Sequence, residues 1–253
     1  MIFVEDLALT YEQQNNNIYD NGVKALANVN LKARRGERVS IIGPSGCGKS
    51  SLLFILAGLI RPSSGNVLID SCEPDSRRTD TALILQDYGL FPWKTVVENA
   101  SLGLEIRGLG KREQSDIVIP ILEKLGLSEF STAYPAQLSG GQRQRVAIAR
   151  SLAFKPSLLL MDEPLSSLDA LTRETLQQFI LEIWREHNLT LVLVTHSIEE
   201  AVFLGSTIAV MSERPGTIIE TIVNPLAGTP GYRQRPEFHK VCSRLRSLLG
   251  VGN

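Results

Sequence analysis

The sequence predicts an α/β fold built on a parallel sheet, with further strands in the first third of the chain and an inserted helical subdomain. Short apolar runs at Arg38–Gly43, Ser157–Glu163 and Thr190–His196 alternate with longer segments of helical spacing. Strands that are apolar along their whole length are typical of a parallel sheet covered on both faces. From about Thr95 to Ala153 the pattern is helical throughout, which indicates the insertion.

The predicted elements of the first third are mainly strands. Ile2–Tyr11 alternates loosely and predicts a strand, and the Asn-rich stretch Asn15–Gly22 predicts a polar turn. Val29–Glu37 predicts a second strand that ends in a turn. The segment Lys49–Ile60 is apolar almost all round, so it predicts a buried helix. The following Arg-Pro-Ser-Ser-Gly turn leads into a strand at Asn66–Asp70.

Helices dominate the middle of the chain. Two of them are predicted at Thr95–Gly108 and Lys111–Leu127, and Pro120 is expected to bend or break the second. Further helices are predicted at Asp169–Asn188 and Ser197–Ser206. The remaining elements are a closing hairpin at Thr207–Asn224 around Arg-Pro-Gly and a short helix in the tail. We expect one domain over residues 1–253, with a core of 1–86 and 154–224, a helical subdomain of 87–153 and a tail of 225–253.

Composition and charge narrow the class of protein. Of the 253 residues, 43% are hydrophobic and 21% charged, which predicts a globular chain. The 26 Lys and Arg residues balance 27 Asp and Glu, so nucleic acid is not an expected partner. The longest apolar run, Leu52–Ile60, is too short to span a membrane, and Glu5 and Asp6 argue against a signal peptide. A cytosolic chain with reduced cysteines is expected.

A glycine-rich stretch follows the first predicted parallel strand. Gly43–Ser50 reads Gly-Pro-Ser-Gly-Cys-Gly-Lys-Ser, the spacing of a P-loop. Glycines allow successive backbone N–H groups to converge on one anion, and the helix that follows points its positive end at the same place. Lys49 adds a full charge for the β- and γ-phosphates, and Ser50 offers a hydroxyl to Mg²⁺.

An acidic pair ends the strand at Ser157–Glu163. Such a strand delivers its terminal carboxylates to the sheet edge where ligands of open α/β sheets bind. Asp162 is suited to hold Mg²⁺, and Glu163 is then free to polarise an attacking water.

Four further motifs occur in order along the chain. They are Gln86 within Leu-Ile-Leu-Gln-Asp-Tyr-Gly-Leu-Phe-Pro-Trp, Leu-Ser-Gly-Gly-Gln at Leu138–Gln142, Ser-Ser-Leu-Asp-Ala at Ser166–Ala170, and His196 within Leu-Val-Thr-His-Ser. With the P-loop and the acidic strand end, they resemble the ATPase subunits of ATP-binding-cassette (ABC) transporters. The Phe91–Trp93 variant, the Arg214–Gly216 turn and the tail look like the nitrate, sulfonate and taurine import subfamily.

The resemblance implies a P-loop NTPase core with an N-terminal antiparallel β subdomain, and it implies an ATP- and Mg²⁺-dependent site. Glu163, His196 and Gln86 are the implied catalytic residues, and Ser50, Gln86 and Asp162 the implied metal ligands. The implied nucleotide contacts are Tyr11 for adenine, Gly43, Pro44, Ser45, Gly46, Cys47, Gly48, Lys49, Ser50 and Ser51 for phosphates, and Ser139, Gly140, Gly141, Gln142 and Asp169 across a dimer interface. Tyr19 is an alternative to Tyr11 as the aromatic residue that stacks on adenine. We favour Tyr11, because it directly ends the first strand.

Single residues also have plainer interpretations. His196 could be a structural histidine at a strand end, and Gln86 an ordinary loop amide. Three arginines of the predicted helix are interpreted as a solvated or interface face and not as phosphate ligands; they are Arg143, Arg145 and Arg150. Trp93 could be a surface side chain, although an exposed indole more often marks a contact.

The expected function is ATP hydrolysis that powers a membrane transporter, most simply import of a small nitrate-, sulfonate- or taurine-like anion. The expected partners are a second ATPase subunit, forming a homodimer unless a different subunit takes that place, separate permease subunits and, indirectly, an extracytoplasmic binding protein. Such a subunit would sit peripherally on the cytoplasmic face of the membrane. An exporter ATPase and an ABC ATPase without a membrane partner are the alternatives; the latter carry long coiled coils between P-loop and signature, where this chain has only a compact insert.

Overall fold

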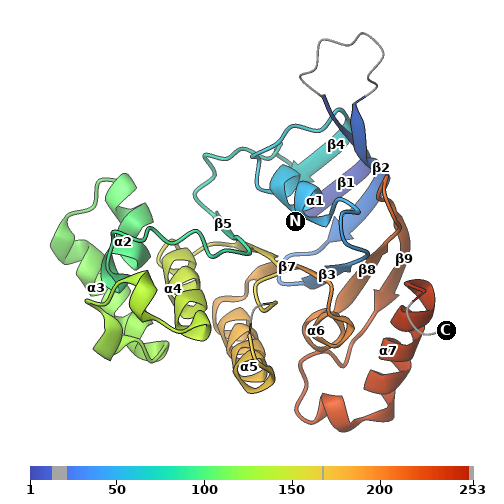
Figure 1. Cartoon of the computed structure of the whole chain (residues 1–253). Coiled ribbons are helices and arrows are strands. Elements are labelled where there is room, and N and C mark those ends of the chain that lie inside the picture. Colours follow the sequence, from blue (N-terminus) through green and yellow to red (C-terminus); the bar gives the residue numbers. More distant parts are fainter. Residues whose placement is uncertain (13–21, 167, 251–253) are drawn as a thin grey trace. The chain divides into compact units, whose positions relative to one another are not determined.

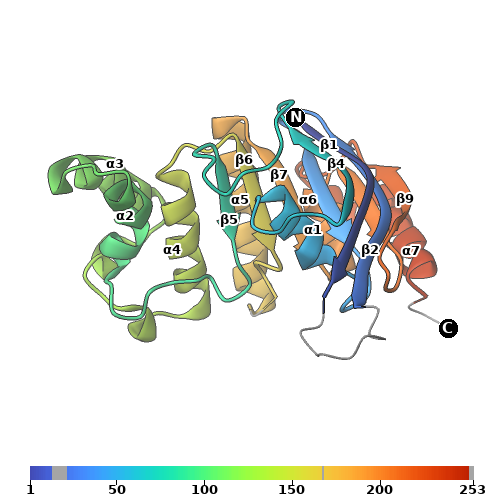
Figure 2. The same ribbon diagram turned by 90° about the horizontal axis from the view of Figure 1, so that it is seen from above.

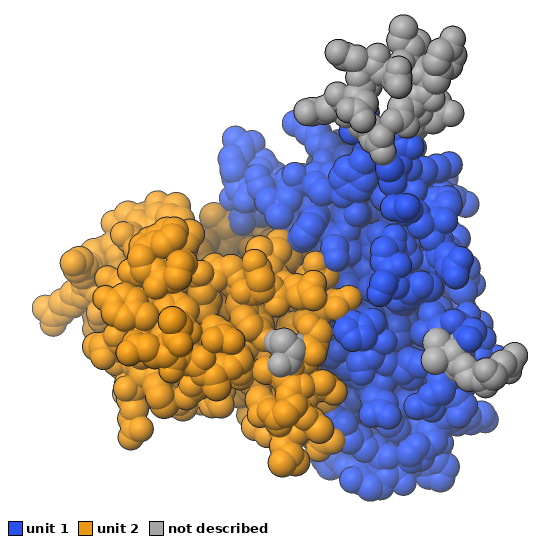
Figure 3. All heavy atoms as spheres, in the orientation of Figure 1, with its two compact units in different colours: residues 1–78, 190–253 blue, residues 79–189 orange. Residues whose placement is uncertain are grey.

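The structure, a computed structural model, describes residues 1–12, 22–166 and 168–250, and it divides into two compact units. Unit 1 comprises Met1–Arg78 and Thr190–Asn253, and unit 2 comprises Thr79–Leu189 (Figure 3). Residues 15–21 of the predicted Asn-rich turn, which include Tyr19, lie outside the described residues.

Unit 1 holds most of the strands. Its elements are, in chain order, β1 (Ile2–Tyr11), β2 (Val23–Ala33), β3 (Arg38–Ile42), α1 (Lys49–Leu56), β4 (Ser64–Ile69), β7 (Thr190–Thr195), α6 (Ile198–Leu204), β8 (Thr207–Met211), β9 (Ile218–Val223), a 3-10 turn (Tyr232–Gln234) and α7 (Pro236–Leu248).

Two sheets organise unit 1. The strands β2, β1 and β4 form an antiparallel sheet in that order (Figure 1). In the second sheet β3 lies between β7 and β8 and is parallel to both, while β9 closes the edge antiparallel to β8. Every residue of β3, β7 and β8 is buried, as their apolar sequences predict. Helix α6 contacts β3, β7 and α7.

Unit 2 contains the helical insertion and one strand pair. Its elements are β5 (Thr81–Ile84), α2 (Val96–Ile106), α3 (Lys111–Lys124), 3-10 turns at Ser128–Phe130 and Pro135–Gln137, α4 (Gly140–Leu152), β6 (Leu158–Asp162) and α5 (Ala170–His187). Strands β5 and β6 are parallel. Helices α2, α3 and α4 pack on one another (Figure 2), and α4 also contacts β5 and α5.

Of the bend or break expected at Pro120, the break is wrong, because α3 runs through this residue. A proline removes one backbone hydrogen bond, here the one to the carbonyl of Asp116. Both residues are exposed, so water can hydrate that carbonyl. The helix is held instead by its buried side chains, Val118 and Leu122.

The predicted fold class is confirmed: an antiparallel β subdomain, a parallel sheet and a helical insertion are all present. The sequence pattern did not predict β5, whose four residues alternate between half-buried and buried positions and include a threonine. Within the described ranges, the structure has no helix that is long and apolar enough to cross a membrane.

Candidate functional site

The P-loop connects β3 to α1, and two of its glycines have backbone angles that other residues rarely adopt. Gly46 has φ of 75°, and Gly48, the N-cap of α1, has φ of 104°. A Cβ added to Gly48 would lie 2.6 Å from Cδ2 of Leu26 and 2.9 Å from the carbonyl oxygen of Ala25. Backbone conformation and packing against β2 therefore both require glycine at position 48.

Lys49 begins α1 and turns its side chain back into the loop. Its Nζ donates hydrogen bonds to the carbonyl oxygens of Gly43, at 2.9 Å, and Pro44, at 2.8 Å, and the side chain is buried. An anion held by the N–H groups of this loop would therefore meet a cation that is already fixed in place.

A turn far along the chain supports the P-loop from outside. A Cβ added to Gly216 would lie 2.0 Å from the carbonyl oxygen of Cys47, so this glycine lies directly against the loop. Gly216 is held there by two hydrogen bonds to β2: its N–H donates to Ala25 and its carbonyl accepts from Ala27. Burial raises the pKa of the Cys47 thiol, and the charge of Lys49 partly opposes this effect.

Tyr11 ends β1, and 41% of its surface is exposed. Its hydroxyl lies 3.0 Å from Oγ of Ser51, which follows the P-loop serine on α1. The ring is thus tethered beside the P-loop and open to solvent, which suits a stacking role.

His196 lies at the same sheet edge as the P-loop. Strands β3 and β7 are parallel neighbours, with Ile42 opposite Thr195. The next residues, Gly43 and His196, therefore leave adjacent strands at their carboxyl ends, and His196 is exposed there.

In unit 2, the acidic pair and Gln86 share one edge in the same way. Ile84 on β5 lies opposite Met161 on β6, so Gln86 and Asp162 both follow at the carboxyl end of this strand pair. Asp162 ends β6 and is buried. Glu163 has φ of 44°, an unusual value for a residue with a side chain, and such strain costs about 1–3 kcal/mol and clusters at functional sites.

The Leu-Ser-Gly-Gly-Gln motif forms the start of α4. Ser139 is the N-cap, and its Oγ accepts a hydrogen bond from the N–H of Gln142 at 3.2 Å. The side-chain oxygen of Gln142 in turn accepts a hydrogen bond from the N–H of Ser139 at 2.8 Å, which completes a capping box. A Cβ added to Gly141 would lie 2.7 Å from Cγ2 of Thr172 on α5, whereas one on Gly140 would meet Leu168 at an ordinary 3.5 Å.

Asp169 is the N-cap of α5. Its carboxylate accepts a hydrogen bond from the N–H of Thr172 at 3.0 Å, and this bond lowers its pKa. Thr172 is also the residue that Gly141 approaches, so the start of α5 and the start of α4 are neighbours in unit 2.

The expectation of a solvated face for three arginines of α4 is wrong, while the alternative of an interface face stays a prediction. Arg143, Arg145 and Arg150 are half-buried, and each guanidinium donates to backbone carbonyls of unit 2. The Arg150 bonds reach Tyr88 at 2.7 Å and Gly89 at 2.6 Å. These side chains hold loops in place around the helix.

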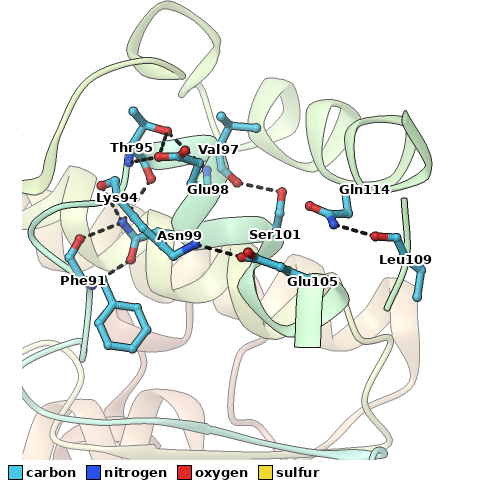
Figure 4. A network of polar contacts seen from close by, with 10 residues as sticks. All are labelled: Phe91, Lys94, Thr95, Val97, Glu98, Asn99, Ser101, Glu105, Leu109 and Gln114. Carbon is cyan, nitrogen blue, oxygen red and sulfur yellow. Dashed lines mark hydrogen bonds and ion pairs between the residues drawn. The ribbon is translucent and has the colours of Figure 1, made fainter. Parts of the chain in front are cut away.

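Sequence reasoning missed Asn99, which is fully buried on α2. Its amide bonds four backbone groups of the segment before the helix, as Figure 4 shows. Asparagine is a poor residue for a helix interior, and the Thr95–Glu98 capping box places Asn99 inside one. That mismatch indicates a role beyond helix formation, although the sequence alone does not identify the partners of the amide.

The residues present fit Mg²⁺ bound together with a nucleotide. Among the residues the structure describes, no three His, Cys, Asp or Glu side chains form a metal cluster. Mg²⁺ does not need one, since it binds through one or two carboxylates, phosphates and water. Each unit offers an oxygen ligand of this kind, the hydroxyl of Ser50 in unit 1 and the carboxylate of Asp162 in unit 2.

A glycine loop at the carboxyl end of a buried parallel strand, with a lysine on the helix that follows, defines a P-loop nucleotide-binding protein. The comparisons with known proteins agree. Residues 26–166 match the ABC transporter family, and the chain belongs to this family. It is an ATP-binding and ATP-hydrolysing cassette of an ABC transporter.

Several relatives match most of the chain. An ABC transporter ATP-binding protein of Methanocaldococcus jannaschii is 45% identical, over 90% of this chain and 85% of its own length. The nitrate import ATP-binding protein NrtD of Synechocystis sp. is 43% identical over 90% of this chain and 88% of its own length. The taurine import ATP-binding protein TauB of Pseudomonas aeruginosa is 41% identical over 86% of this chain and 81% of its own length. The expected resemblance to the nitrate and taurine subfamily is confirmed.

Solved structures share the fold. The dimeric bacterial ABC transporter cassette MJ0796 superposes with a TM-score of 0.78 and 33% identity, and covers 88% of this chain and 98% of that one. The same cassette in a post-hydrolysis dimer with ADP and Pi gives a TM-score of 0.77 at 33% identity, and the match covers 88% of this chain and 98% of that one.

Proposed function

We propose that this ABC ATPase powers the import of a small anion of the nitrate, sulfonate or taurine kind. The observation that carries the proposal is the 43% identity to a nitrate importer subunit over 90% of the chain. Taurine importer subunits match at a similar level, and taurine is itself a sulfonate. The common chemistry of these cargoes is a small oxyanion.

In this proposal unit 1 binds the nucleotide. The N–H groups of Gly43–Ser50 and the positive end of α1 hold the phosphates, and Lys49 neutralises them. Tyr11 stacks on adenine, with its hydroxyl tethered to Ser51. His196, at the same sheet edge, contacts the γ-phosphate as charge develops there.

The carboxylates of unit 2 supply the chemistry of hydrolysis. Glu163 accepts a proton from the attacking water. Ser50, Gln86 and Asp162 hold Mg²⁺ directly or through water. When bound, this ion spreads the charge of the transferring phosphoryl group.

The proposed assembly has two ATPase subunits and separate permease subunits. Ser139, Gly140, Gly141, Gln142 and Asp169 of one subunit contact the nucleotide bound by the other, so ATP joins the pair. The dimeric cassette MJ0796 supports this arrangement. The Phe91–Trp93 segment docks the permease, which places the subunit on the cytoplasmic face of the membrane. The boundaries at residues 87 and 153 of the helical subdomain stay predictions.

The test uses the complex recovered from membranes with the tagged chain. The permease that co-purifies is placed in proteoliposomes with its binding protein, which is then loaded with nitrate, taurine or no anion. We expect one of these anions to raise the melting temperature of the binding protein, stimulate ATP hydrolysis and enter on the side opposite the ATPase. Movement of the anion toward the binding-protein side would indicate an exporter, and hydrolysis stimulated by DNA a cassette without a permease.

A further inference from the structure

An aromatic pair of unit 2, half-buried Phe91 and exposed Trp93, sits on a segment that is unusually well anchored. Phe91 and Trp93 lie with ring centroids 5.1 Å apart at an interplanar angle of 30°. Trp93 is 69% exposed, so most of the indole faces solvent. A large apolar side chain in such a position is a strong anchor for a partner if its backbone is held still.

Asn99 holds the segment from the α2 side. Its Oδ1 accepts a hydrogen bond from the N–H of Phe91 at 2.8 Å. Its Nδ2 donates to the carbonyl oxygens of Phe91 at 3.1 Å, Lys94 at 2.8 Å and Thr95 at 3.0 Å (Figure 4). One buried amide thus fixes the backbone on both sides of Trp93.

Arg150 holds the same segment from α4. Its two terminal nitrogens donate to the carbonyls of Tyr88 and Gly89, which have left-handed φ angles of 65° and 54°. Burial lowers the pKa of this guanidinium, and the charge of Asp87 partly opposes the effect. A planar fork can bind two adjacent carbonyls, which the single ammonium of a lysine matches poorly.

We propose that Asn99 and Arg150 are positioning residues that hold the Tyr88–Thr95 segment in one conformation, so that Phe91 and Trp93 are presented ready-made to the permease. The inference rests on the docking role given above to this segment. Because the segment is ordered before binding, the permease loses little free energy in fixing it. Arg150 also ties this surface to α4, the helix whose N-cap is Ser139.

The first experiment measures the motion of Trp93 without any partner. The chain has two tryptophans, so Trp184→Phe leaves Trp93 as the single fluorophore. In this background, Asn99→Ala and Arg150→Lys should each increase the fast component of the anisotropy decay of Trp93. ATP hydrolysis by the isolated Asn99→Ala subunit should stay unchanged.

Two matched controls separate this role from a general loss of structure. Ser101 is buried on α2 as well, but its hydroxyl bonds only Val97 of the same helix. Arg145 lies on α4 as Arg150 does, but it bonds Leu125. Ser101→Ala and Arg145→Lys should leave the motion of Trp93 unaltered. If Asn99→Ala folds poorly, Arg150→Lys carries the same test.

The second experiment measures recovery of the permease with the tagged chain. Asn99→Ala should weaken assembly about tenfold, since the cost of ordering the segment now falls on binding. An unchanged Trp93 decay in the folded Asn99→Ala and Arg150→Lys variants, or an equal change in the controls, would overturn the inference. So would a loosened Trp93 with full assembly. If Trp93→Ala itself assembles normally, the docking role fails instead.

Discussion

The two glycine turns of this chain, Gly43–Ser50 in unit 1 and Leu138–Gln142 in unit 2, use glycine for different physical reasons. In the P-loop, Gly46 and Gly48 adopt left-handed backbone angles. At the second turn Gly140 is already a residue of helix α4, and its backbone needs no special freedom. The same residue type therefore marks two kinds of site.

Their surroundings differ as well. The P-loop packs against other parts of its own unit, with β2 against Gly48 and the Gly216 turn against Cys47. The space beside Gly140 would accept a Cβ at an ordinary distance. The fold of unit 2 thus explains the glycine at 141, which packs against α5, but not the one at 140. A molecule that approaches from outside would explain it, and the following predictions test this difference.

Lys49→Ala should have the largest effect. The P-loop would keep its glycine geometry but lose the cation held between the carbonyls of Gly43 and Pro44. We expect kcat to fall by roughly 100-fold or more, as removal of one charge-stabilising group does in other enzymes. Steady-state ATPase assays measure hydrolysis, and titration with a fluorescent ATP analogue measures nucleotide binding. Normal turnover by Lys49→Ala would rule out the P-loop assignment.

The Gly140 side of the comparison is tested in a Glu163→Gln background. Without its general base, the subunit should bind ATP, hydrolyse it very slowly and accumulate as a closed dimer. Adding Gly140→Asp places a carboxylate where a partner's phosphate should approach, at a cost of several kcal/mol in a dry interface. Light scattering should then show monomers with ATP still bound.

Gly140→Ala is the matched control for charge, because its Cβ meets only Leu168 at an ordinary distance. It should weaken dimer formation far less than Gly140→Asp. A Gly140→Asp protein that dimerises with ATP as readily as its Glu163→Gln parent would show that this turn meets no phosphate.

Gly216→Ala tests whether the fold shapes the P-loop. The new Cβ would be 2.0 Å from the carbonyl oxygen of Cys47, so the loop or the turn must shift. Overpacking of this kind costs about 1–3 kcal/mol, and we expect ATP affinity to fall about tenfold, measured by titration of the monomer. Gly140→Ala should leave this affinity unchanged, and equal losses in the two variants would erase the contrast between the turns.

The sequence predicted the local features well because each depends on neighbouring residues. Short continuous stretches of sequence determine the P-loop, the buried strands and the acidic end of β6. The support of Cys47 by Gly216 was not predicted, because it joins positions far apart in the chain. The four bonds of Asn99 were missed because a buried amide looks like any polar residue until its partners are placed. Arg150 was misjudged for the same reason.

The smallest predicted effect concerns Ser139, whose hydroxyl caps α4 and is also expected to meet a partner's phosphate. Ser139→Ala removes the cap and should lower stability by about 1 kcal/mol, a fall in Tm of roughly 2–4 °C for a chain of this size. Ser139→Asp caps a helix as well as serine does, so its Tm should match the wild type in differential scanning calorimetry.

The aspartate also adds a negative charge at the exposed end of α4, and this separates the two roles. In the Glu163→Gln background, Ser139→Asp should recover the Tm that Ser139→Ala loses, yet it should not recover ATP-dependent dimerisation, because like charges repel across the interface. If capping were the whole contribution of Ser139, then stability and dimerisation would return together in Ser139→Asp. That result would leave the second glycine turn with a structural role only, and the P-loop as the one phosphate site of the two.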